Sequence, residues 1–522
     1  MTSPDTALDA LAARFLRGLS LSPGSAAVVA GGASVTYTAA HERALLWAGA
    51  LPVPPSGPRA PVGVLAGRGV DAYLAILACV YAGVPVVPLL ADFPAARSRH
   101  MLRAAGVSAL IVDDAGLAAL GELELGDEIP VLVAGRTGAE KDGSGLRRLV
   151  PDPAHALAEP RTVASSDVAY VLFTSGSTGS PKGVRLTHGN MAHYFRLMDE
   201  WYDFTADDVF SQAANLNWDS AVSDLWCAWG AGATLVSVPA HAYRDMPAFL
   251  AEHHVSVWFS APSAIALIRR MGGLGPGSLP SLRWTYFGGE ALKCDDADDW
   301  QRAAPHSAVV NVYGPTEMTI TTHRHLWRPE VSRRLGVNGV VPLGVLHEGH
   351  EQLLLSDDGQ EADDEGELCL WGPQLSAGYL DPEHGRGRCA EWAGRTWYRT
   401  GDRVRRTPGG DLVYLGRIDA QVQIQGLRVE LAEIDHAVRG CTGVVDAVTV
   451  TRHTAQGTEL FVFYTGDHES AGALGRAVSR QLPSGMVPRH YHHLDEFPLN
   501  PNRKIDRLVL ARRAQELLTA VN

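Results

Sequence analysis

Residues 175–183 (SGSTGSPKG) form a run of glycines and hydroxyl side chains that could bind a polyphosphate. Glycine lets the backbone curve around a ligand without a Cβ clash, and successive N–H groups in such a turn make an anion-binding concavity. No Gly-Lys-Ser/Thr ends the run, so it is not a Walker loop. A flexible glycine–serine loop is the alternative interpretation. The candidate ligand-binding residues are Thr174, Ser175, Gly176, Ser177, Thr178, Gly179 and Lys182.

A second motif, residues 311–317 (NVYGPTE), follows an apolar run. A strand that stops at Gly-Pro presents its next side chains at the carboxyl end of an α/β sheet, where ligands bind. Glu317 could coordinate Mg²⁺, which prefers oxygen ligands, and Thr316 could hydrogen-bond a phosphate. Tyr313 offers a flat face on which a base can stack. An ordinary helix N-cap at Thr316 is the alternative.

Two charged residues further along the chain suit other parts of a nucleotide. Asp402, in the motif YRTGD, carries an acceptor-only carboxylate that suits the two hydroxyls of a ribose. Arg417, in the motif GRID, can pair with phosphate or ribose oxygens in a forked geometry. Tyr414 is either a packing partner of the nucleotide or a core tyrosine.

The elements around these motifs alternate between strand-like and helix-like segments through the first four-fifths of the chain. Continuous apolar strands separated by helices indicate parallel sheets covered on both faces. Examples of such strand-like runs are residues 62–65, 84–89, 109–112, 233–238 and 255–259. From about Gly366 the strands become shorter and alternate in polarity, and a small α/β segment follows residues 416–419. We therefore expect two domains of unequal size.

Bulk composition excludes several classes of protein. A chain of 522 residues with 46% hydrophobic residues can bury large cores and is too long for one ordinary domain. The formal net charge of −13 argues against a general nucleic-acid binder. The six cysteines are scattered without a CxxC pair, which suits a reducing cytosol better than a zinc site or a disulfide framework. No signal peptide or membrane span is evident, so we expect a cytoplasmic location.

The motifs resemble, in content and order, those of the adenylate-forming (ANL) superfamily. The chain is most similar to the stand-alone amino-acid adenylation enzymes of nonribosomal peptide synthetase type and to the D-alanine carrier-protein ligases. The resemblance extends from residues 35–37 (VTY) to residues 506–507. It implies an α/β fold. A large adenylating domain (1–417) would have doubly wound sheets and a distorted β-barrel region, and a small mobile α+β lid domain (418–522) would carry the catalytic lysine.

The resemblance also assigns catalytic roles. Lys504 would reach the substrate carboxylate and the α-phosphate, where a compact ammonium can stabilise the developing charge. Glu317 and Thr316 would be catalytic as well, with Glu317 as the metal ligand, so the cofactors implied are ATP and Mg²⁺. Taken alone, Lys504 would be interpreted as a solvated surface lysine. The ATP-binding residues would be those of the 174–182 run named above together with Gly289, Glu290, Asn311, Tyr313, Gly314, Asp402, Tyr414 and Arg417.

The hinge of the family corresponds to Asp419, about which the small domain would rotate between two half-reactions. An ordinary turn aspartate is the alternative for this residue taken alone. Two residues depart from the family pattern. Arg503 stands where glycine is usual, and Gln423 stands where many relatives carry lysine.

The segment 218–226 (WDSAVSDLW) resembles the substrate-recognition segment of the family. Asp219 stands where an aspartate holds the substrate ammonium, and a partly buried carboxylate needs such a cation. A helix-capping carboxylate is the alternative. The other pocket positions implied are Ser220, Ser223, Phe259, Tyr286, Gly288, Val312, Ile320 and Thr321. None offers a full charge, so a charged substrate side chain would be buried unpaired; the two aromatic residues either fill the pocket or belong to the core.

The expected function is the ATP-dependent activation of a small neutral amino acid, similar to alanine, glycine or serine, as aminoacyl-AMP. Transfer to the phosphopantetheine thiol of a carrier protein would follow, in natural-product (antibiotic) biosynthesis. No serine-bearing carrier segment follows the Lys504 motif, so we expect a separate carrier. Neither nucleic acid nor membrane is an expected partner. Candidate docking charges for the carrier are Arg403, Arg405 and Arg406, although a solvated basic turn is the favoured interpretation of these residues.

Other functions compatible with the motifs remain open. Asp219 would hold the amino group of a β-amino acid equally well, as in a polyketide or macrolactam pathway. An acyl-CoA ligase of the same fold is a second alternative, because fold does not fix function. A non-enzymatic nucleotide-binding or scaffold protein is a further alternative. The presence together of five residues speaks against it: Thr178, Glu317, Asp402, Arg417 and Lys504.

Overall fold

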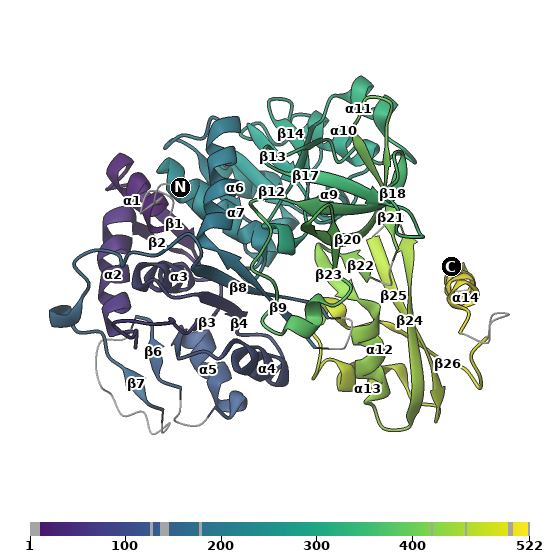
Figure 1. Cartoon of the computed structure of the whole chain (residues 1–522), viewed down its shortest axis with the longest axis horizontal. Helices are drawn as coiled ribbons and strands as arrows, with labels where there is room; N and C mark the ends of the chain where they lie inside the picture. The colour runs from purple at the N-terminus through teal and green to yellow at the C-terminus, as the bar shows by residue number, and fades with distance from the viewer. Residues whose placement is uncertain are drawn as a thin grey trace.

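The computed structural model describes residues 11–125, 129–135, 146–176, 180–418, 421–454, 457–498 and 505–519. In these ranges the chain forms a large N-terminal domain, which ends with strand β21, and a small C-terminal domain, which begins with strand β22 (Figure 1). This is the α/β architecture that the sequence predicts. The predicted boundary at 417/418 stays a prediction, and the predicted hinge residue Asp419 lies outside the described residues.

One sheet of the large domain has seven strands in the order β7-β6-β5-β3-β4-β8-β9. All pairs are parallel except β8 with β9, which is antiparallel. Its strands are β3 (Val62–Ala66), β4 (Val86–Leu90), β5 (Ala109–Val112), β6 (Val131–Val133), β7 (Arg148–Leu149), β8 (Val168–Thr174) and β9 (Lys182–Thr187). The apolar runs near residues 62, 84 and 109 are thus parallel strands, as predicted.

The other sheet of the large domain has nine strands in the order β16-β15-β14-β13-β12-β10-β11-β1-β2. Its centre is parallel and its edges are antiparallel. Its strands are β1 (Ala26–Ala30), β2 (Ala33–Thr36), β10 (Val209–Gln212), β11 (Thr234–Ser237), β12 (Val257–Ser260), β13 (Trp284–Phe287), β14 (Ala308–Tyr313), β15 (His323–Leu326) and β16 (Val345–Leu346).

Helix α3 (Val70–Ala82) lies between these two sheets and contacts strands of both. Every residue from Ala72 to Ala82 is buried, as expected for a helix that is apolar on all sides. The other α-helices of the large domain are α1 (Leu11–Leu21), α2 (Tyr37–Ala50), α4 (Ala95–Ala105), α5 (Asp114–Leu123), α6 (His188–Trp201), α7 (Asp219–Ala231), α8 (Met246–Glu252), α9 (Ser263–Arg270), α10 (Cys294–Ala303) and α11 (Pro329–Leu335). Within the described ranges, none of the helices has the length and apolar composition of a membrane span.

The region expected as a distorted barrel consists of a five-stranded antiparallel sheet, in which β17-β18-β20-β19 are neighbours and β21 also pairs with β20. Its strands are β17 (Glu351–Leu355), β18 (Glu365–Trp371), β19 (Cys389–Trp392), β20 (Arg395–Arg406) and β21 (Leu412–Arg417). It carries Asp402 and Arg417 to the edge of the nine-stranded sheet.

The small domain contains a hairpin, a three-stranded sheet in the order β24-β25-β26 and three α-helices. Its elements are β22 (Gln421–Ile424), β23 (Leu427–Glu430), α12 (Leu431–Arg439), β24 (Val444–Thr454), β25 (Gly457–Gly466), α13 (Ala471–Val478), β26 (His490–His493) and α14 (Arg507–Thr519). Helices α12 and α13 pack on one face of this sheet and α14 packs on the other. Figure 1 shows α14 on the side away from the large domain.

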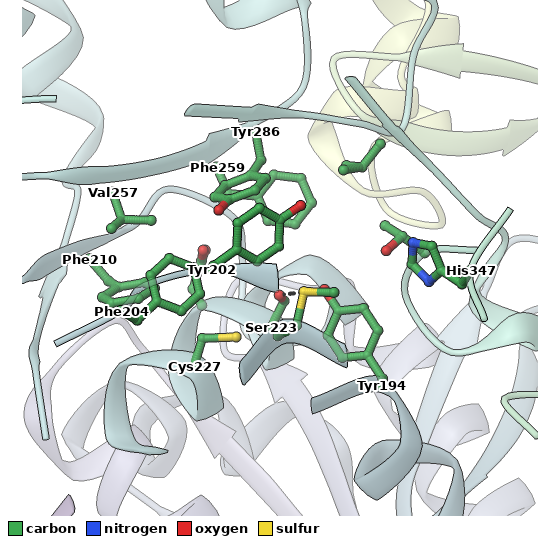
Figure 2. A pocket seen from close by; sticks show the side chains of 14 residues that line it. Tyr194, Tyr202, Phe204, Phe210, Ser223, Cys227, Val257, Phe259, Tyr286 and His347 are labelled. Carbon is green, nitrogen blue, oxygen red and sulfur yellow. Dashed lines mark hydrogen bonds between the residues drawn. The ribbon is translucent and has the colours of Figure 1, made fainter. Parts of the chain in front are cut away.

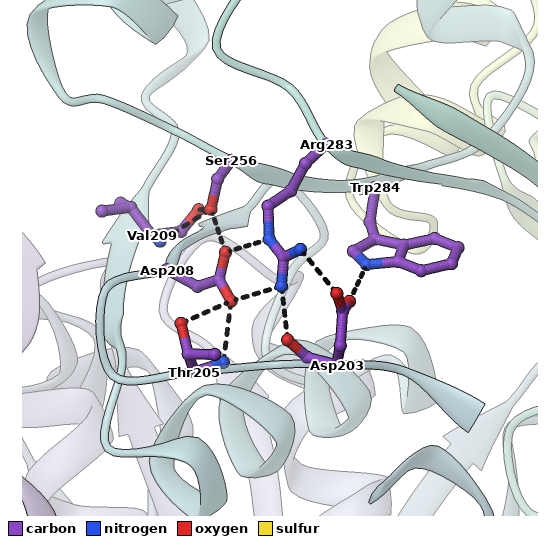
Figure 3. A network of polar contacts seen from close by, with 7 residues as sticks. All are labelled: Asp203, Thr205, Asp208, Val209, Ser256, Arg283 and Trp284. Carbon is purple, nitrogen blue, oxygen red and sulfur yellow. Dashed lines mark hydrogen bonds and ion pairs between the residues drawn. The ribbon is translucent and has the colours of Figure 1, made fainter. Parts of the chain in front are cut away.

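A polar network ties together the amino-terminal ends of three neighbouring strands of the nine-stranded sheet (Figure 3). Asp208, Ser256 and Arg283 directly precede β10, β12 and β13. The buried Asp208 carboxylate accepts from Arg283 Nε at 2.7 Å and from Ser256 Oγ at 2.7 Å. Arg283 also reaches Asp203, which accepts from the Trp284 indole at 2.8 Å. The network fixes the sheet at the end opposite to the carboxyl ends, where α/β proteins bind ligands.

Replacing Asp208 with asparagine should therefore destabilise the fold. Asparagine keeps the volume but leaves Arg283 without its buried anion, a loss of roughly 2 kcal/mol for a pair that is partly exposed on the arginine side. We expect an earlier urea midpoint, followed by tryptophan fluorescence. The matched control is Arg196→Ala, which removes the exposed pair with Glu200 and should cost at most about 0.5 kcal/mol. Equal shifts of the urea midpoint for both variants would show that the buried network stabilises the fold no more than an exposed ion pair does.

Candidate functional site

The predicted site residues lie at the carboxyl ends of β12, β13 and β14. Strand β14 ends at Tyr313, and after Gly314 and Pro315 a single 3₁₀ turn spans Thr316–Met318. The chain thus stops at Gly-Pro as the sequence predicts, and the side chains of 313–317 come together beside β20 and β21. This is the edge at which parallel sheets bind ligands.

Three of the residues predicted to bind a nucleotide are in direct contact. The Asp402 carboxylate accepts from the Tyr313 hydroxyl at 2.5 Å and from Arg417 Nη1 at 2.8 Å. Burial raises the pKa of Asp402, while the Arg417 charge and the Tyr313 hydrogen bond oppose the rise. Nearby, the Asn311 amide donates to the Pro342 carbonyl at 2.8 Å. An anion, a cation and an aromatic face therefore meet in one place.

The Glu317 carboxylate lies beside this cluster with 2% of the residue exposed. One oxygen accepts from the Tyr379 hydroxyl at 2.6 Å, and the other accepts from Arg428 Nη1 at 2.9 Å. Burial alone would raise the pKa of Glu317, but Arg428 and Tyr379 hold it below its usual value, so the group is ionised. Neither of these partners was identified from the sequence.

The residues around Glu317 fit a magnesium ion held mainly by a nucleotide. The described part of the chain has no cluster of three acidic, histidine or cysteine side chains that could hold a metal alone. Mg²⁺ commonly takes one or two carboxylates, waters and substrate phosphates. A single ionised carboxylate meets that requirement once Arg428 has left it.

Asp219, the first residue of α7, connects the Glu317 turn to the predicted substrate pocket. Its carboxylate accepts from Thr316 Oγ1 at 2.8 Å. Burial raises the pKa of Asp219 to about 6, and the Thr316 hydrogen bond limits the rise. No cation of the protein is paired with it among the described hydrogen bonds and ion pairs, so the group can serve a cation that arrives with a ligand.

The described part of the glycine-rich run contacts the small domain. Ser175 Oγ donates to the Arg428 carbonyl at 2.6 Å, and the Gly176 N–H donates to Glu433 Oε2 at 3.3 Å. A Cβ at Gly176 would lie 1.9 Å from the Ser180 carbonyl oxygen, so only glycine fits this turn. Lys182 is buried beside Glu430 and Glu317; burial lowers its pKa. Predicted residues of this run that lie outside the described residues are Ser177, Thr178 and Gly179.

A cavity opens beside α7, and predicted pocket residues form part of its wall (Figure 2). The volume of the cavity that is open to the centre of a water-sized sphere is about 20 Å³. This is enough for little more than one water or a small substituent. The predicted residues in its lining are Ser223, Phe259, Tyr286, Val312 and Thr321. The lining also includes five residues that were not predicted from the sequence: Tyr194, Tyr202, Phe204, Cys227 and His347.

Aromatic side chains form much of the cavity wall, and Ser223, Asp224 and Thr321 add polar groups to it. Ser223 Oγ and the Tyr194 hydroxyl lie 2.8 Å apart and form a hydrogen bond. The buried Tyr286 hydroxyl has no hydrogen-bond partner among the residues that the structure describes. Tyr286 packs edge-to-face on Tyr202 and on Phe259, with ring centroids 5.0 and 6.1 Å away. Phe259 and Tyr286 therefore line the cavity and also belong to the hydrophobic core.

Four predicted pocket positions lie beside the cavity and do not line it: Asp219, Ser220, Gly288 and Ile320. At Gly288 a Cβ would approach Val312 Cγ2 to 2.9 Å, so a side chain there would intrude on the wall. Ile320 and Thr319 have left-handed backbones, with φ of 73° and 54°, a strained state for β-branched residues. The Gln374 amide holds this turn by donating to the carbonyls of Thr319 and Thr321, each at 2.8 Å.

Several predicted residues have other partners in this structure. The Glu290 carboxylate accepts from the backbone N–H groups of Ser263 and Gly426, and Gly289 beside it has a left-handed backbone. Tyr414 is partly buried against the core of the antiparallel sheet. The predicted catalytic Lys504 and its neighbour Arg503 lie outside the described residues.

The three arginines considered as docking charges are engaged within the large domain. Arg403 and Arg405 both pair with Glu365, at 2.8 and 2.7 Å, and Arg406 donates to the Asp363 carbonyl. The structure therefore favours the alternative interpretation, in which they belong to an ordinary basic turn.

Comparisons with known proteins agree with this geometry. A family model described as AMP-binding enzyme matches residues 17–380. An L-proline–[L-prolyl-carrier protein] ligase of Streptomyces coelicolor is 32% identical, over 83% of this chain and 83% of that protein. The phenyloxazoline synthase MbtB of Mycobacterium sp. (strain MCS) is also 32% identical, but this chain spans 41% of its length.

Solved structures agree over nearly the whole chain. The crystal structure of IdnL7 is 52% identical, with a TM-score of 0.75 over 97% of this chain and 99% of that one. The Vibrio cholerae adenylation domain AlmE, in complex with glycyl-adenosine-5'-phosphate, is 26% identical. Its TM-score is 0.85 over 99% of this chain and 98% of that one.

The pKa of Asp219 predicts a pH-dependent gain in stability for Asp219→Asn. Because the folded-state pKa, about 6, lies above that of the unfolded chain, ionisation destabilises the native state as pH rises toward 6. That penalty persists at higher pH and amounts to at most about 3 kcal/mol. The variant should therefore unfold at a higher temperature than the parent at pH 8, and the difference should vanish near pH 4. The control is Asp207→Asn, at an exposed position outside the site, which should change the unfolding temperature little at either pH. A pH-independent difference for Asp219→Asn would contradict the assignment.

Proposed function

Because the chain belongs to the AMP-binding enzymes and is an AMP-forming amino-acid ligase, we propose that it activates a small neutral amino acid with ATP and transfers it to the phosphopantetheine thiol of a carrier protein. The observation that carries this proposal is the contact between Thr316 and Asp219. It supports the proposal because Asp219, which has no cation partner among the described hydrogen bonds and ion pairs, lies next to the turn that carries Glu317.

Relatives support the class of substrate. Carrier-protein ligases for L-proline and D-alanine are among them, and a D-alanine–D-alanyl carrier protein ligase of Bacillus cytotoxicus is 28% identical over 86% of this chain. The AlmE structure holds glycyl-adenosine-5'-phosphate. These acyl groups are small and uncharged, as the narrow cavity requires. We place this activity in natural-product biosynthesis, and the carrier is its proposed partner.

In the first half-reaction, an oxygen of the amino-acid carboxylate attacks the α-phosphorus of ATP. The new O–P bond replaces the bond to the β-phosphate oxygen, and pyrophosphate leaves. Asp219 holds the substrate ammonium, Asp402 accepts from the ribose hydroxyls, and Tyr313 stacks on the base. The N–H and hydroxyl groups of the glycine-rich run, with Lys182, orient the outgoing phosphates. Mg²⁺ on Glu317, when bound, neutralises phosphate charge.

Lys504 completes this step by placing its ammonium beside the attacking carboxylate and the α-phosphate. In the structure, however, Gly426 of the small domain faces the site and Ile505 packs on the opposite face of the small sheet, with α14. We assign Lys504 to the first half-reaction and assign the turn of the small domain between the half-reactions to Asp419; both residues lie outside the described residues. The observed arrangement suits the second half-reaction. There the thiol sulfur attacks the mixed-anhydride carbonyl, AMP leaves, and the thiol proton passes to solvent.

Amino-acid-dependent exchange between ATP and labelled pyrophosphate tests the proposal. The assay should cover the proteinogenic amino acids, D-alanine and several β-amino acids. We expect exchange with alanine, glycine or serine, and weaker exchange below pH 6 as Asp219 becomes protonated. Exchange with β-amino acids alone would keep the chemistry and overturn the substrate class. Exchange only with fatty or aryl acids would overturn the role of Asp219.

Lys504→Ala should separate binding from chemistry. ATP should still bind, because Asp402, Arg417 and Tyr313 remain, whereas adenylate formation should fall by roughly a hundredfold or more, as for loss of a transition-state charge partner. Single-turnover adenylate formation and calorimetric ATP binding measure the two effects. Lys293→Ala, at an exposed lysine before α10, is the control and should retain parental rates. A parental rate of adenylate formation in Lys504→Ala would remove Lys504 from the mechanism.

A further inference from the structure

Residues 426–433 of the small domain, which we call the docking segment, contact the large domain at several points. Its Gly426 N–H donates to Glu290 Oε1 at 2.7 Å, and a Cβ at Gly426 would lie 2.9 Å from the Trp218 ring. Further along, Glu430 pairs with Arg388 at 3.4 Å. The docking segment thus enters the site at close range and is held there by polar contacts.

The most deeply buried of these contacts is the ion pair between Arg97 and Glu433. Arg97 lies on α4 of the large domain and Glu433 on α12 of the small domain, and Nη1 and Oε1 are 2.5 Å apart. Only 9% of the Arg97 side chain and 1% of the Glu433 side chain are exposed. A buried ion pair adds little net stability, because both charges lose their hydration when it forms. Removing one partner while the domains stay docked leaves the other charge buried and uncompensated. The pair therefore favours one placement of the small domain specifically.

The docking segment also occupies groups that a nucleotide needs. The second oxygen of Glu433 accepts the Gly176 N–H of the glycine-rich run, where a phosphate oxygen would otherwise be held. The Arg428 guanidinium donates to Glu317 Oε2, an oxygen of the carboxylate proposed to hold the metal. The Glu433 carboxylate thus takes the proposed place of a phosphate, and the Arg428 guanidinium takes the proposed place of a metal ion. Docking and phosphate binding compete for the same atoms.

We propose that Arg97 and Glu433 are positioning residues for the transfer half-reaction, which dock the small domain after pyrophosphate has left. The proposal rests on the two-step function above. Pyrophosphate on the Gly176 N–H excludes the Glu433 carboxylate, so the pair closes only on an emptied phosphate site. Closure holds the docking segment at the site, where the Gly426 N–H bonds to Glu290. Breaking the pair should shift the enzyme toward the undocked arrangement, because the ion pair stabilises only the docked state. Pyrophosphate binds the undocked state and shifts the same equilibrium in the opposite direction from the ion pair.

This competition predicts two effects of opposite sign. In Arg97→Ala and in Glu433→Gln, magnesium pyrophosphate should bind roughly tenfold more tightly, since the competing contact is gone. Transfer from the adenylate to pantetheine, the terminal part of a carrier arm, should slow by roughly tenfold or more, because the docked arrangement is less populated. Adenylate formation, trapped with hydroxylamine as the hydroxamate, should persist. A purely structural role would weaken all three together.

The measurements are calorimetric titration with magnesium pyrophosphate, hydroxamate yield, and single-turnover transfer to pantetheine. Arg97→Lys keeps a cation and should recover part of the transfer rate and the weaker pyrophosphate binding. Arg99→Ala is the matched control on the same helix, because Arg99 pairs with the exposed Glu124 and not with the small domain; it should behave as the parent.

Weaker pyrophosphate binding in Arg97→Ala would overturn the proposal, because it would make Arg97 a phosphate ligand. Unchanged transfer in both variants would overturn it as well. Failure of the proposed function has a different signature, in which the parent forms no hydroxamate with any amino acid. The pyrophosphate titration can still be read in that case, since it requires no amino acid and no carrier.

Discussion

The buried carboxylate of Glu317 needs a positive partner, and the arrangement of both domains depends on which partner it has. With 2% of the residue exposed, it cannot rely on water. In the structure, the small domain supplies Arg428, and the loop between β18 and β19 supplies the Tyr379 hydroxyl. In the proposed reaction a metal–nucleotide complex would supply the charge, and Arg428 would have to move away. One electrostatic requirement thus couples the chemistry of the site to the position of a domain.

Much of the fold could be predicted because the parallel strands are apolar on both faces. Runs such as 62–65 and 109–112 are buried strands for that reason, and the helix between them, α3, is apolar on all sides. Local backbone geometry requires the Gly-Pro stop after Tyr313 and the glycine at 176. Both motifs could therefore be recognised from the sequence. The contact of Tyr313 with Asp402 and Arg417 follows from two such motifs meeting at one sheet edge.

The rest of the site depends on contacts between residues far apart in the chain, which no local pattern encodes. Arg97 and Glu433 are separated by 336 positions, and neither stands in a spacing that suggests a partner. Tyr194 reaches Ser223 from α6, and in sequence it resembles any apolar helix residue. The arginines at 403 and 405 looked available only because their partner, Glu365, lies on the neighbouring strand. Positions 177–179 and 504 remain predictions.

The left-handed turn at Thr319 and Ile320 bears on how this pocket can change during evolution. Gln374, completely buried in a different loop, holds that turn through three backbone carbonyls, and Thr319 returns a hydrogen bond to the Gln374 carbonyl. A residue exchanged at 320 or 321 is therefore accommodated by two loops at once. Selectivity at these positions should evolve in linked steps, and a pocket residue grafted from a relative should work only together with the loop that supports it there.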